Sequence, residues 1–311
     1  MTIIVIAGGL SHERDVSLRS GRRVAQALRD IGREVVETDV NADLVGLLQR
    51  TPNPVVVPML HGGLGEDGAL REVLGVLGVP FVGPGGAASR LTFDKSVATP
   101  VIRAAGIETP RQVALPHDIF RDLGAQALMD GLGGQVGYPL IVKPARSGSA
   151  LGVTKVTEPG ELPSALVAAY AYGPVAVVES YVDGVEIAVT VLDDGDGPVA
   201  LPAVEIRPLS GVYDYESRYT AGATRFVTPA ELPDDVLDAA GELAVAAHKA
   251  LGLRHLSRFD LIVSDGRPVF IEGNVAPGMT ETSLAPLAFE AADRGLGEVF
   301  AKLVDLAQSA G

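Results

Sequence analysis

The segment SRFDLIVSDGRPVFIEGNVAPG, residues 257–278, contains two apolar runs joined by Ser-Asp-Gly-Arg. This pattern predicts two adjacent antiparallel strands connected by a tight turn. Strand residues two apart point to the same face, so Glu272 and Asn274 are expected side by side. Oxygen donors on one face suit a hard cation such as Mg²⁺. Taken alone, the decapeptide Ile271–Thr280 is better explained as a polar strand end that enters a Pro-Gly turn.

The preceding strand strengthens the metal interpretation. Arg258 and Asp260 are also two apart, and antiparallel pairing would bring Asp260 beside Glu272 and Asn274. Three oxygen donors next to a guanidinium suit phosphoryl transfer, in which metal and Arg neutralise charge in the transition state. The specificity of this prediction lies in the combination of residues rather than in any one of them.

Composition limits the class of protein. The 311 residues suffice for two or three domains, and an apolar fraction of 47% indicates a globular chain. The absence of cysteine excludes disulfides, thiolate metal sites and a cysteine nucleophile. A formal charge of −14 argues against a nucleic-acid partner but is compatible with a local basic phosphate pocket. The start MTIIVIAGGLSHERD lacks signal-peptide features and every apolar run is interrupted, so we expect a soluble cytoplasmic α/β protein without a membrane partner.

Alternating strand and helix patterns predict a parallel, doubly wound first section that ends near Leu91. The predicted strands are TIIVIAG, REVVETDV, NPVVVPML and GVPFVG, at residues 2–8, 33–40, 53–60 and 78–83. Between the first two, SLRSGRRVAQALRDIG has helical spacing, with Val24, Leu28 and Ile31 on one stripe. The Gly pair after the first strand lacks the full G-x-G-x-x-G pattern, so a Rossmann cofactor site is not expected.

From Phe93 onward the pattern predicts a small mixed section and then a third section. The predicted elements are a helix at 94–106, two strands around a Gly/Ser loop within 138–156, two strands joined at Asp183-Gly184 within 175–192, and a helix at 234–252. The stretch RPLSGVYDYESRYTAGATRF, residues 207–226, is predicted to be irregular. Long loops inside compact domains are usually functional or disordered, and its aromatic and charged composition favours function.

Two further motifs are compatible with a nucleotide, although each has a simpler explanation. Lys143 ends a strand, and the small residues of loop 147–152 would let backbone N–H groups approach phosphate oxygens. No Walker G-K-[ST] occurs, and an ordinary hairpin loop is the alternative. Glu179 and Glu186 flank a turn and could hold a nucleoside, but alone they fit two surface acids on a hairpin better.

Together the motifs identify a family. The chain resembles the D-alanine–D-alanine ligases of the ATP-grasp superfamily over essentially its whole length. The motifs that carry the resemblance, in the family order, are GGLSHERDVSLRSG, LHGGLGEDG, FDKSVA, IVKPARSGSALG, VVESYVDGVE, YDYESRYTAG, SRFD and EGNVAPGMTETSL. The resemblance implies a three-domain ATP-grasp fold of the α/β class. It comprises a doubly wound N-terminal domain (1–92), a central subdomain (93–183) and a C-terminal subdomain (184–311) with a mobile loop near 209–226.

The implied reaction is the ATP-dependent ligation of two D-alanine molecules for peptidoglycan precursor synthesis. The carboxylate of the first amino acid would become an acyl phosphate, which the amine of the second would attack. For ATP, the resemblance implies phosphate contacts from Lys95, Lys143 and Arg218, adenine contacts from Glu179, Tyr181 and Val182, and a ribose contact from Glu186. Two Mg²⁺ or Mn²⁺ ions would be held by Asp260, Glu272 and Asn274.

The resemblance also implies an amino-acid site. Glu13 would bind the ammonium group of the first D-amino acid, with His61 nearby, and Ser283 and Leu284 would meet the carboxylate of the second. Arg258 and the backbone N–H of Gly278 would stabilise the tetrahedral intermediate. Ser149 would close over the phosphates and the substrate, and Tyr219 of the mobile loop would hydrogen-bond toward Ser149 and Glu13.

Several positions depart from the family pattern without removing a named ligand. They are Arg218 in place of Lys, Ala150 in place of a second serine, and Arg71, Glu72, Phe259, Gly273 and Val275. An alternative is therefore a related ligase of specialised metabolism with a different second substrate. A non-catalytic nucleotide-binding homologue is disfavoured because Arg258, Asp260, Glu272 and Asn274 are intact. Tyr219 favours an amine nucleophile, and the family comparison predicts a homodimer.

Overall fold

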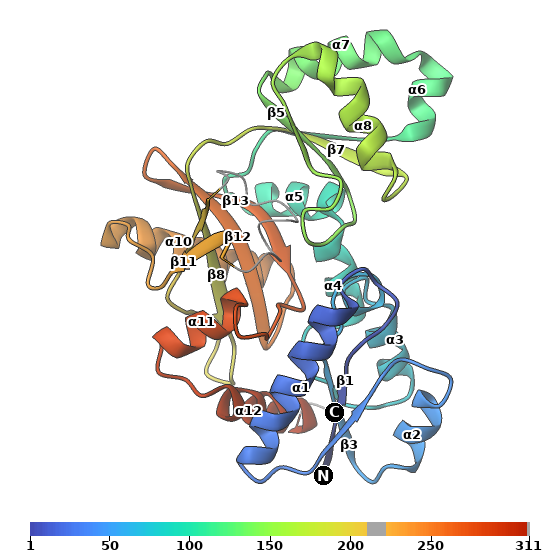
Figure 1. Cartoon of the computed structure of the whole chain (residues 1–311), viewed down its shortest axis with the longest axis vertical. Coiled ribbons are helices and arrows are strands. Elements are labelled where there is room, and N and C mark those ends of the chain that lie inside the picture. Colours follow the sequence, from blue (N-terminus) through green and yellow to red (C-terminus); the bar gives the residue numbers. More distant parts are fainter. Residues whose placement is uncertain (210–221, 310–311) are drawn as a thin grey trace.

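The computed structural model describes residues 1–209 and 222–309. Its strands form three sheets, and helices pack on each of them (Figure 1). The four-stranded sheet and its helices form a lobe at the top of the view, while the first sheet and the last helix lie at the bottom. No helix within the described ranges has the length and apolar composition needed to cross a bilayer.

The first sheet is parallel, with strand order β2-β1-β3. Its elements are β1 (Thr2–Ile6), α1 (Arg14–Asp30), β2 (Val35–Thr38), α2 (Leu44–Arg50), β3 (Pro54–Pro58), the 3₁₀ turn η1 (Gly63–Gly65) and α3 (Ala69–Val76). All residues of β1 are buried, as expected for a central parallel strand covered on both faces. The predicted helix and the first three predicted strands are confirmed, although Ile31 follows the helix and is 45% exposed.

The fourth predicted strand, residues 78–83, is wrong. Only one bridge forms there, between Val56 and Phe81, and the backbone bonds on either side of it run from Val56 N to Pro80 O and from Val82 N to Val56 O. Pro80 has no N–H to extend a ladder, and Gly83 turns the chain away with φ of 101°. The apolar residues that resembled a strand are buried beside β3 without becoming one.

The second sheet is antiparallel, with strand order β4-β7-β5-β6. Its elements are β4 (Gln112–Pro116), α6 (His117–Leu123), α7 (Ala125–Val136), β5 (Leu140–Pro144), β6 (Thr154–Val156), the 3₁₀ turn η2 (Pro159–Glu161), α8 (Leu162–Tyr170) and β7 (Val175–Ser180). Leu140, Val142 and Val178 pack against α8 in one apolar core. The predicted strand, Gly/Ser loop and strand correspond to β5, the loop after it, and β6.

The third sheet has strand order β11-β10-β8-β12-β13, with β9 paired to β8. Its strands are β8 (Val185–Leu192), β9 (Val199–Ala200), β10 (Val204–Pro208), β11 (Thr224–Val227), β12 (Leu256–Ser264) and β13 (Arg267–Asn274). The helices α4 (Gly86–Phe93), α5 (Lys95–Ala104), α10 (Asp234–Ala250), α11 (Leu284–Ala291) and α12 (Leu296–Ser309) complete the fold. The helices predicted at 94–106 and 234–252 correspond to α5 and α10.

Two predictions in this region need correction. The strands on either side of Asp183-Gly184 exist, but they are not a hairpin, because β7 belongs to the second sheet and β8 to the third. The irregular stretch was predicted too long, since Arg207 and Pro208 end β10 and residues 224–226 begin β11. Positions 210–221 lie outside the described residues.

Two helices pack on sheets that are distant from them in sequence. Phe300 and Val304 of α12 share a core with Ile3 and Val5, so the C-terminal helix packs beside α1 on the first sheet. Ile102 of α5 packs in the core of the third sheet, although α5 precedes the second sheet in sequence. Helices distant in sequence from the first and third sheets therefore complete the cores of those sheets.

Candidate active site

The β12–β13 hairpin carries the charged residues at its open end. The strands pair antiparallel, with Asp260 opposite Glu272 and Arg258 opposite Asn274, and the turn lies at Ser264–Arg267 as predicted. Asp265 and Gly266 both have positive φ, at 48° and 75°, as a tight hairpin turn requires.

Arg258 holds Asp260 through a two-point contact. Its Nε donates to Oδ1 at 2.7 Å and its Nη2 donates to Oδ2 at 2.9 Å. Asn274 Nδ2 lies 3.4 Å from the same Oδ2. The predicted shared face of these residues is thus confirmed, and the buried carboxylate is balanced by a planar cation that matches its geometry.

Two departures from the family pattern explain each other. Phe259 and Gly273 lie opposite one another across the hairpin. A Cβ at position 273 would come within 3.1 Å of the Phe259 ring, which is fully buried against Phe270. The large ring therefore fills the space that the glycine leaves, beside the charged residues of the same hairpin.

Lys95 provides a second cation beside the hairpin. It opens α5, and its Nζ lies 3.2 Å from Glu272 Oε2 and donates to the carbonyl oxygen of Ser147 at 2.8 Å. Asp94 caps the helix by accepting from Ser96 N at 3.1 Å, which fixes where Lys95 leaves the backbone. The Gly/Ser loop is thereby tied to the hairpin through Lys95.

A pocket lined by both lysines, which we term the Lys143 pocket, lies between the second and third sheets. Its lining residues are Lys95, Ile141, Lys143, Ser147, Ala150, Val153, Glu179, Ser180, Tyr181, Val182, Glu186, Asp260, Leu261, Ile262, Ile271 and Glu272. Isoleucine and leucine side chains supply apolar walls, and the charged side chains come from β5, β7, β8, α5 and the β12–β13 hairpin. This combination of apolar walls and a few convergent polar groups is typical of small-molecule sites.

Glu179 and Lys143 form a buried ion pair in this pocket. Lys143 Nζ lies 2.5 Å from Glu179 Oε1, and both side chains are 5% exposed. The other carboxylate oxygen, Oε2, is buried and accepts no hydrogen bond within the described part of the chain. Glu179 is therefore not a surface acid of a hairpin, and a buried acceptor without a partner favours a ligand that donates there. Glu186 lies across the pocket on β8, opposite Ile262.

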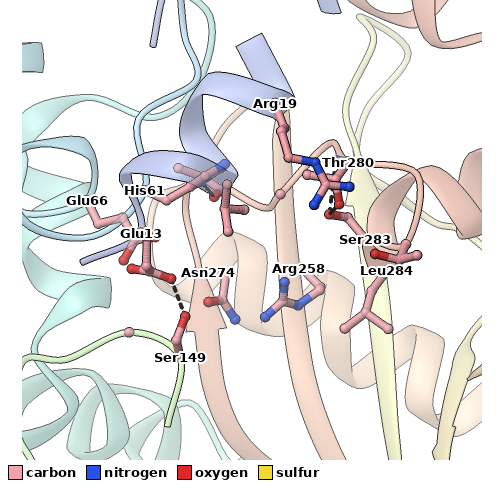
Figure 2. A pocket seen from close by; sticks show the side chains of 15 residues that line it. Glu13, Arg19, His61, Glu66, Ser149, Arg258, Asn274, Thr280, Ser283 and Leu284 are labelled. Atoms are coloured by element: carbon pink, nitrogen blue, oxygen red, sulfur yellow. Dashed lines mark hydrogen bonds between the residues drawn. The ribbon is translucent and has the colours of Figure 1, made fainter. Parts of the chain in front are cut away.

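A second pocket, which we term the Glu13 pocket, lies where the first sheet meets the hairpin. Its lining residues are Glu13, Val16, Arg19, His61, Glu66, Gly148, Ser149, Arg258, Asn274, Ala276, Gly278, Thr280, Thr282, Ser283 and Leu284. Figure 2 shows Glu13, Glu66 and Ser149 at one end, Arg19, Thr280 and Ser283 at the other, and Arg258 with Asn274 along the wall between them.

The carboxylate of Glu13 contacts Ser149 and lies close to the backbone of Gly62 and Gly148. It precedes the first residue of α1, and Ser149 Oγ donates to its Oε1 (Figure 2). A Cβ at Gly62 would lie 2.6 Å from Glu13 Oε2, and one at Gly148 would lie 2.7 Å from it, so neither position has room for a side chain. Ser149 itself has φ of 54°, a left-handed conformation that costs a non-glycine residue about 1 kcal/mol or more.

His61 and Glu66 are buried at the same end. His61 Nδ1 lies 2.9 Å from the Ala276 carbonyl oxygen and Nε2 lies 3.0 Å from Ser20 Oγ. Burial lowers the pKa of His61. Burial, together with the nearby charge of Glu13, raises the pKa of Glu66 to about 7. The carboxylates of Glu13 and Glu66 repel each other when both are ionised, so a cation bound at this end of the pocket would be stabilised.

The turn after the hairpin shapes the other end. Met279 N donates to Ser20 Oγ at 2.9 Å, and Thr280 N donates to Ser283 Oγ at 3.0 Å. A Cβ at Gly278 would lie 2.8 Å from Ser283 Oγ, so the backbone passes close to that hydroxyl. Ser283 precedes α11, whose N-terminus therefore faces the pocket beside the glycine.

The two pockets collect the predicted residues that lie within the described ranges. Glu13, His61, Ser149, Arg258, Asn274, Gly278, Ser283 and Leu284 line the Glu13 pocket, and Lys95, Lys143, Glu179, Tyr181, Val182, Glu186, Asp260 and Glu272 line the Lys143 pocket. The positions of Arg218 and Tyr219 lie outside the described residues. Sequence reasoning missed Glu66, a buried acid within the quoted GEDG motif, and Arg19, one helical turn beyond Val16.

Comparison with known proteins identifies the family. The family model described as "D-ala D-ala ligase C-terminus" matches residues 101–305. The chain belongs to the D-alanine–D-alanine ligase family. The D-alanine–D-alanine ligase of Moorella thermoacetica is 40% identical over 308 residues, covering 99% of each chain. That of Gloeobacter violaceus is 40% identical, covering 98% of this chain and 99% of its own.

Solved structures of the ligase family share the fold. The Bacillus anthracis D-alanine–D-alanine ligase superposes with a TM-score of 0.85 at 30% identity, covering 100% of both chains. A structure of the same protein complexed with ATP gives a TM-score of 0.81, covering 100% of this chain and 98% of that one. The VanG D-Ala:D-Ser ligase of Enterococcus faecalis gives 0.85 at 28% identity, covering 98% of this chain and 99% of its own. The predicted ATP-grasp α/β fold is thereby confirmed.

Proposed function

We propose that this chain joins two D-alanine molecules into D-alanyl-D-alanine at the expense of ATP, as a step of peptidoglycan precursor synthesis. The observation that carries the proposal is the meeting of two unlike pockets at the β12–β13 hairpin. One pocket has apolar walls and two lysines, and the other has acids at one end and a helix N-terminus at the other. A ligase that activates a carboxylate with ATP needs these two sites side by side.

The Lys143 pocket fits ATP. Glu179 Oε2 is a buried acceptor that an adenine amino group could satisfy, and Lys95 and Lys143 supply positive charge for phosphate oxygens. Ile141 and Leu261 provide apolar surface for a flat ring, while Glu186 on β8 would accept from ribose. When bound, ATP supplies the phosphoryl group that activates the carboxylate of the first D-alanine.

The hairpin fits Mg²⁺ or Mn²⁺. Asp260, Glu272 and Asn274 would hold two ions through oxygen donors, the chemistry that these metals prefer. Within the described ranges, no cluster of three or more His, Cys, Asp or Glu side chains is placed for a metal, and the proposed donor set therefore combines two carboxylates with the amide of Asn274. Bound metal would neutralise phosphate charge next to the ion pairs that Arg258 forms with Asp260 and Lys95 forms with Glu272.

The Glu13 pocket would orient both amino acids. Glu13 would accept from the ammonium group of the first D-alanine, and Ser149, bonded to Glu13, would approach its carboxylate. Arg258 and the N–H of Gly278 would donate to the oxygen that becomes negative when the second amine attacks. Ser283 and the backbone of Leu284 would bind the second carboxylate at the N-terminus of α11.

The test is phosphate release from ATP with a panel of D-amino acid pairs, with each product identified by mass. We expect release with D-alanine alone and a product of two alanines. Phosphate release only with D-alanine plus D-serine or a hydroxy acid would instead identify a related ligase with a different second substrate. The likeness to the VanG D-Ala:D-Ser ligase is the reason to include these pairs. Nucleotide binding without any ligated product would overturn it. Light scattering of the same sample would test the expected homodimer.

A further inference from the structure

The outer end of the Glu13 pocket contains a cation that the proposed mechanism does not use. Arg19 lies one turn beyond Val16 on α1, and both line the pocket. Its Nη2 lies 3.0 Å from Glu281 Oε2, with the two side chains 57% and 67% exposed. Figure 2 shows the Arg19 guanidinium directed toward Thr280 and Ser283, away from Glu13.

The charges along this pocket are divided between its ends. Among the described lining residues, the carboxylates are Glu13 and Glu66, and both lie at the end opposite to Arg19. At the Arg19 end, Thr280 Oγ1 and Ser283 Oγ lie 2.8 Å apart beside the start of α11. A guanidinium, hydroxyl groups and a helix N-terminus together favour an anion at this end.

The pairing of Arg19 with Glu281 makes such an anion exchangeable. An exposed ion pair contributes at most about 1 kcal/mol, so releasing Glu281 costs little. An incoming carboxylate can replace Glu281 and accept from the N–H groups of the guanidinium. The chain has a formal charge of −14, so a local cation at the mouth also offsets a field that repels anions.

We propose that Arg19 is a specificity-determining residue for the second amino acid, whose α-carboxylate it binds in exchange for Glu281. The inference rests on the proposed function and adds a residue to it. Glu281 keeps the guanidinium at the mouth while the site is empty. Arg19 then favours second substrates that carry a carboxylate over neutral amines of the same size.

A competition assay isolates this step. D-Alaninamide has no carboxylate to activate, so it can act only as the second substrate. With D-alanine and D-alaninamide mixed at fixed concentrations, the ratio of dipeptide to dipeptide amide reports discrimination at the second subsite alone. We expect Arg19→Met to lower this ratio about tenfold, the effect of losing one partly exposed charged contact. Arg19→Lys should restore part of it.

Two matched variants decide between explanations. Arg22 is exposed on the next turn of α1 and does not line the Glu13 pocket, so Arg22→Met should leave the ratio unchanged. Glu281→Gln releases Arg19 and should leave the ratio unchanged or raise it.

An equal fall in the product ratio of Arg19→Met and Glu281→Gln would mean that the ion pair only fixes the turn. An equal fall of the product ratio in Arg22→Met would mean that positive charge anywhere on this face of α1 attracts the carboxylate, without a specific contact from Arg19. Either result, or no change in Arg19→Met, overturns the inference. A wild-type protein that forms neither product overturns the proposed function itself.

Discussion

Glu66→Gln is a substitution for which the structure predicts a large pH-dependent change in stability. Glu66 is 9% exposed, and burial with the nearby charge of Glu13 raises its pKa to about 7 from the ordinary value of 4.5. Glutamine has nearly the same shape as the protonated acid but cannot ionise. The variant therefore resembles wild type at low pH and differs from it where Glu66 must carry a charge.

The sign follows from proton binding. Between pH 4.5 and 7 the folded state keeps the Glu66 proton while the unfolded state has lost it, so raising the pH destabilises the wild-type fold. The ionisation of Glu66 is expected to cost the wild-type protein about 2.5 kcal/mol more at pH 8 than at pH 5. Glu66→Gln removes that cost. For a chain of this length, the difference corresponds to about 4 °C in the thermal midpoint.

The assay is thermal unfolding of both proteins at pH 5 and pH 8 in the same salt. We expect nearly equal midpoints at pH 5 and a variant midpoint about 4 °C higher at pH 8. The control is Glu72→Gln, which removes one carboxylate from α3 whose side chain is 53% exposed, and its offset should not change with pH. Parallel wild-type and Glu66→Gln midpoints across this range would refute the claim that burial opposes the charge of Glu66.

Three further predictions concern the hairpin, the first substrate and acid stability. Glu272→Gln should lower kcat about 100-fold while leaving the fold intact, because it weakens the metal donor set; full wild-type activity in excess chelator would contradict this. Glu13→Gln should raise KM for the first D-alanine about tenfold or more with little change in KM for ATP, and equal small changes in steady-state kinetics would count against an ammonium site. Burial lowers the pKa of His248 to about 4, so its neutral ring stabilises the fold above pH 6.5 and this contribution is lost as the pH falls toward 4. Between pH 7 and pH 4, the free energy of unfolding of His248→Gln should fall by about 3 kcal/mol less than that of wild type. Thermal midpoints of the two proteins that fall in parallel over this range would contradict a lowered pKa of His248.

Most of the fold could be predicted because local patterns and tertiary packing agree. The β12–β13 hairpin follows from an Asp-Gly turn between apolar runs, and the register then follows from the turn. The 78–83 segment failed because an apolar run next to a sheet resembles a strand, while ladder formation also needs the N–H that Pro80 lacks. Sequence spacing also gave no sign that β7 and β8 belong to different sheets, since two strands close in sequence usually pair.

The candidate site divides in the same way. Residues within one strand pair, such as Asp260 and Glu272, could be placed together from alternation and the turn. Lys95 could be matched to a motif, but its contact with Glu272 depends on α5 packing against the third sheet, which no local pattern encodes. Arg19 was missed for a related reason: helical periodicity shows which face it shares, but only the tertiary structure brings Thr280 to that face.

The ion pairs at the site share one physical consequence. Arg258 with Asp260, Lys95 with Glu272 and Lys143 with Glu179 leave no uncompensated charge within these pairs, although each is largely buried. A lone buried charge would cost several kcal/mol, so pairing keeps the folded protein stable without ligand. The proposed substrates and ions carry charges of the same sign as the groups they would replace: phosphates could replace carboxylates at the lysines, and metal ions could replace cations at the acids. Ligand binding would then exchange partners rather than create new buried charge, which makes it compatible with a fold that is already formed.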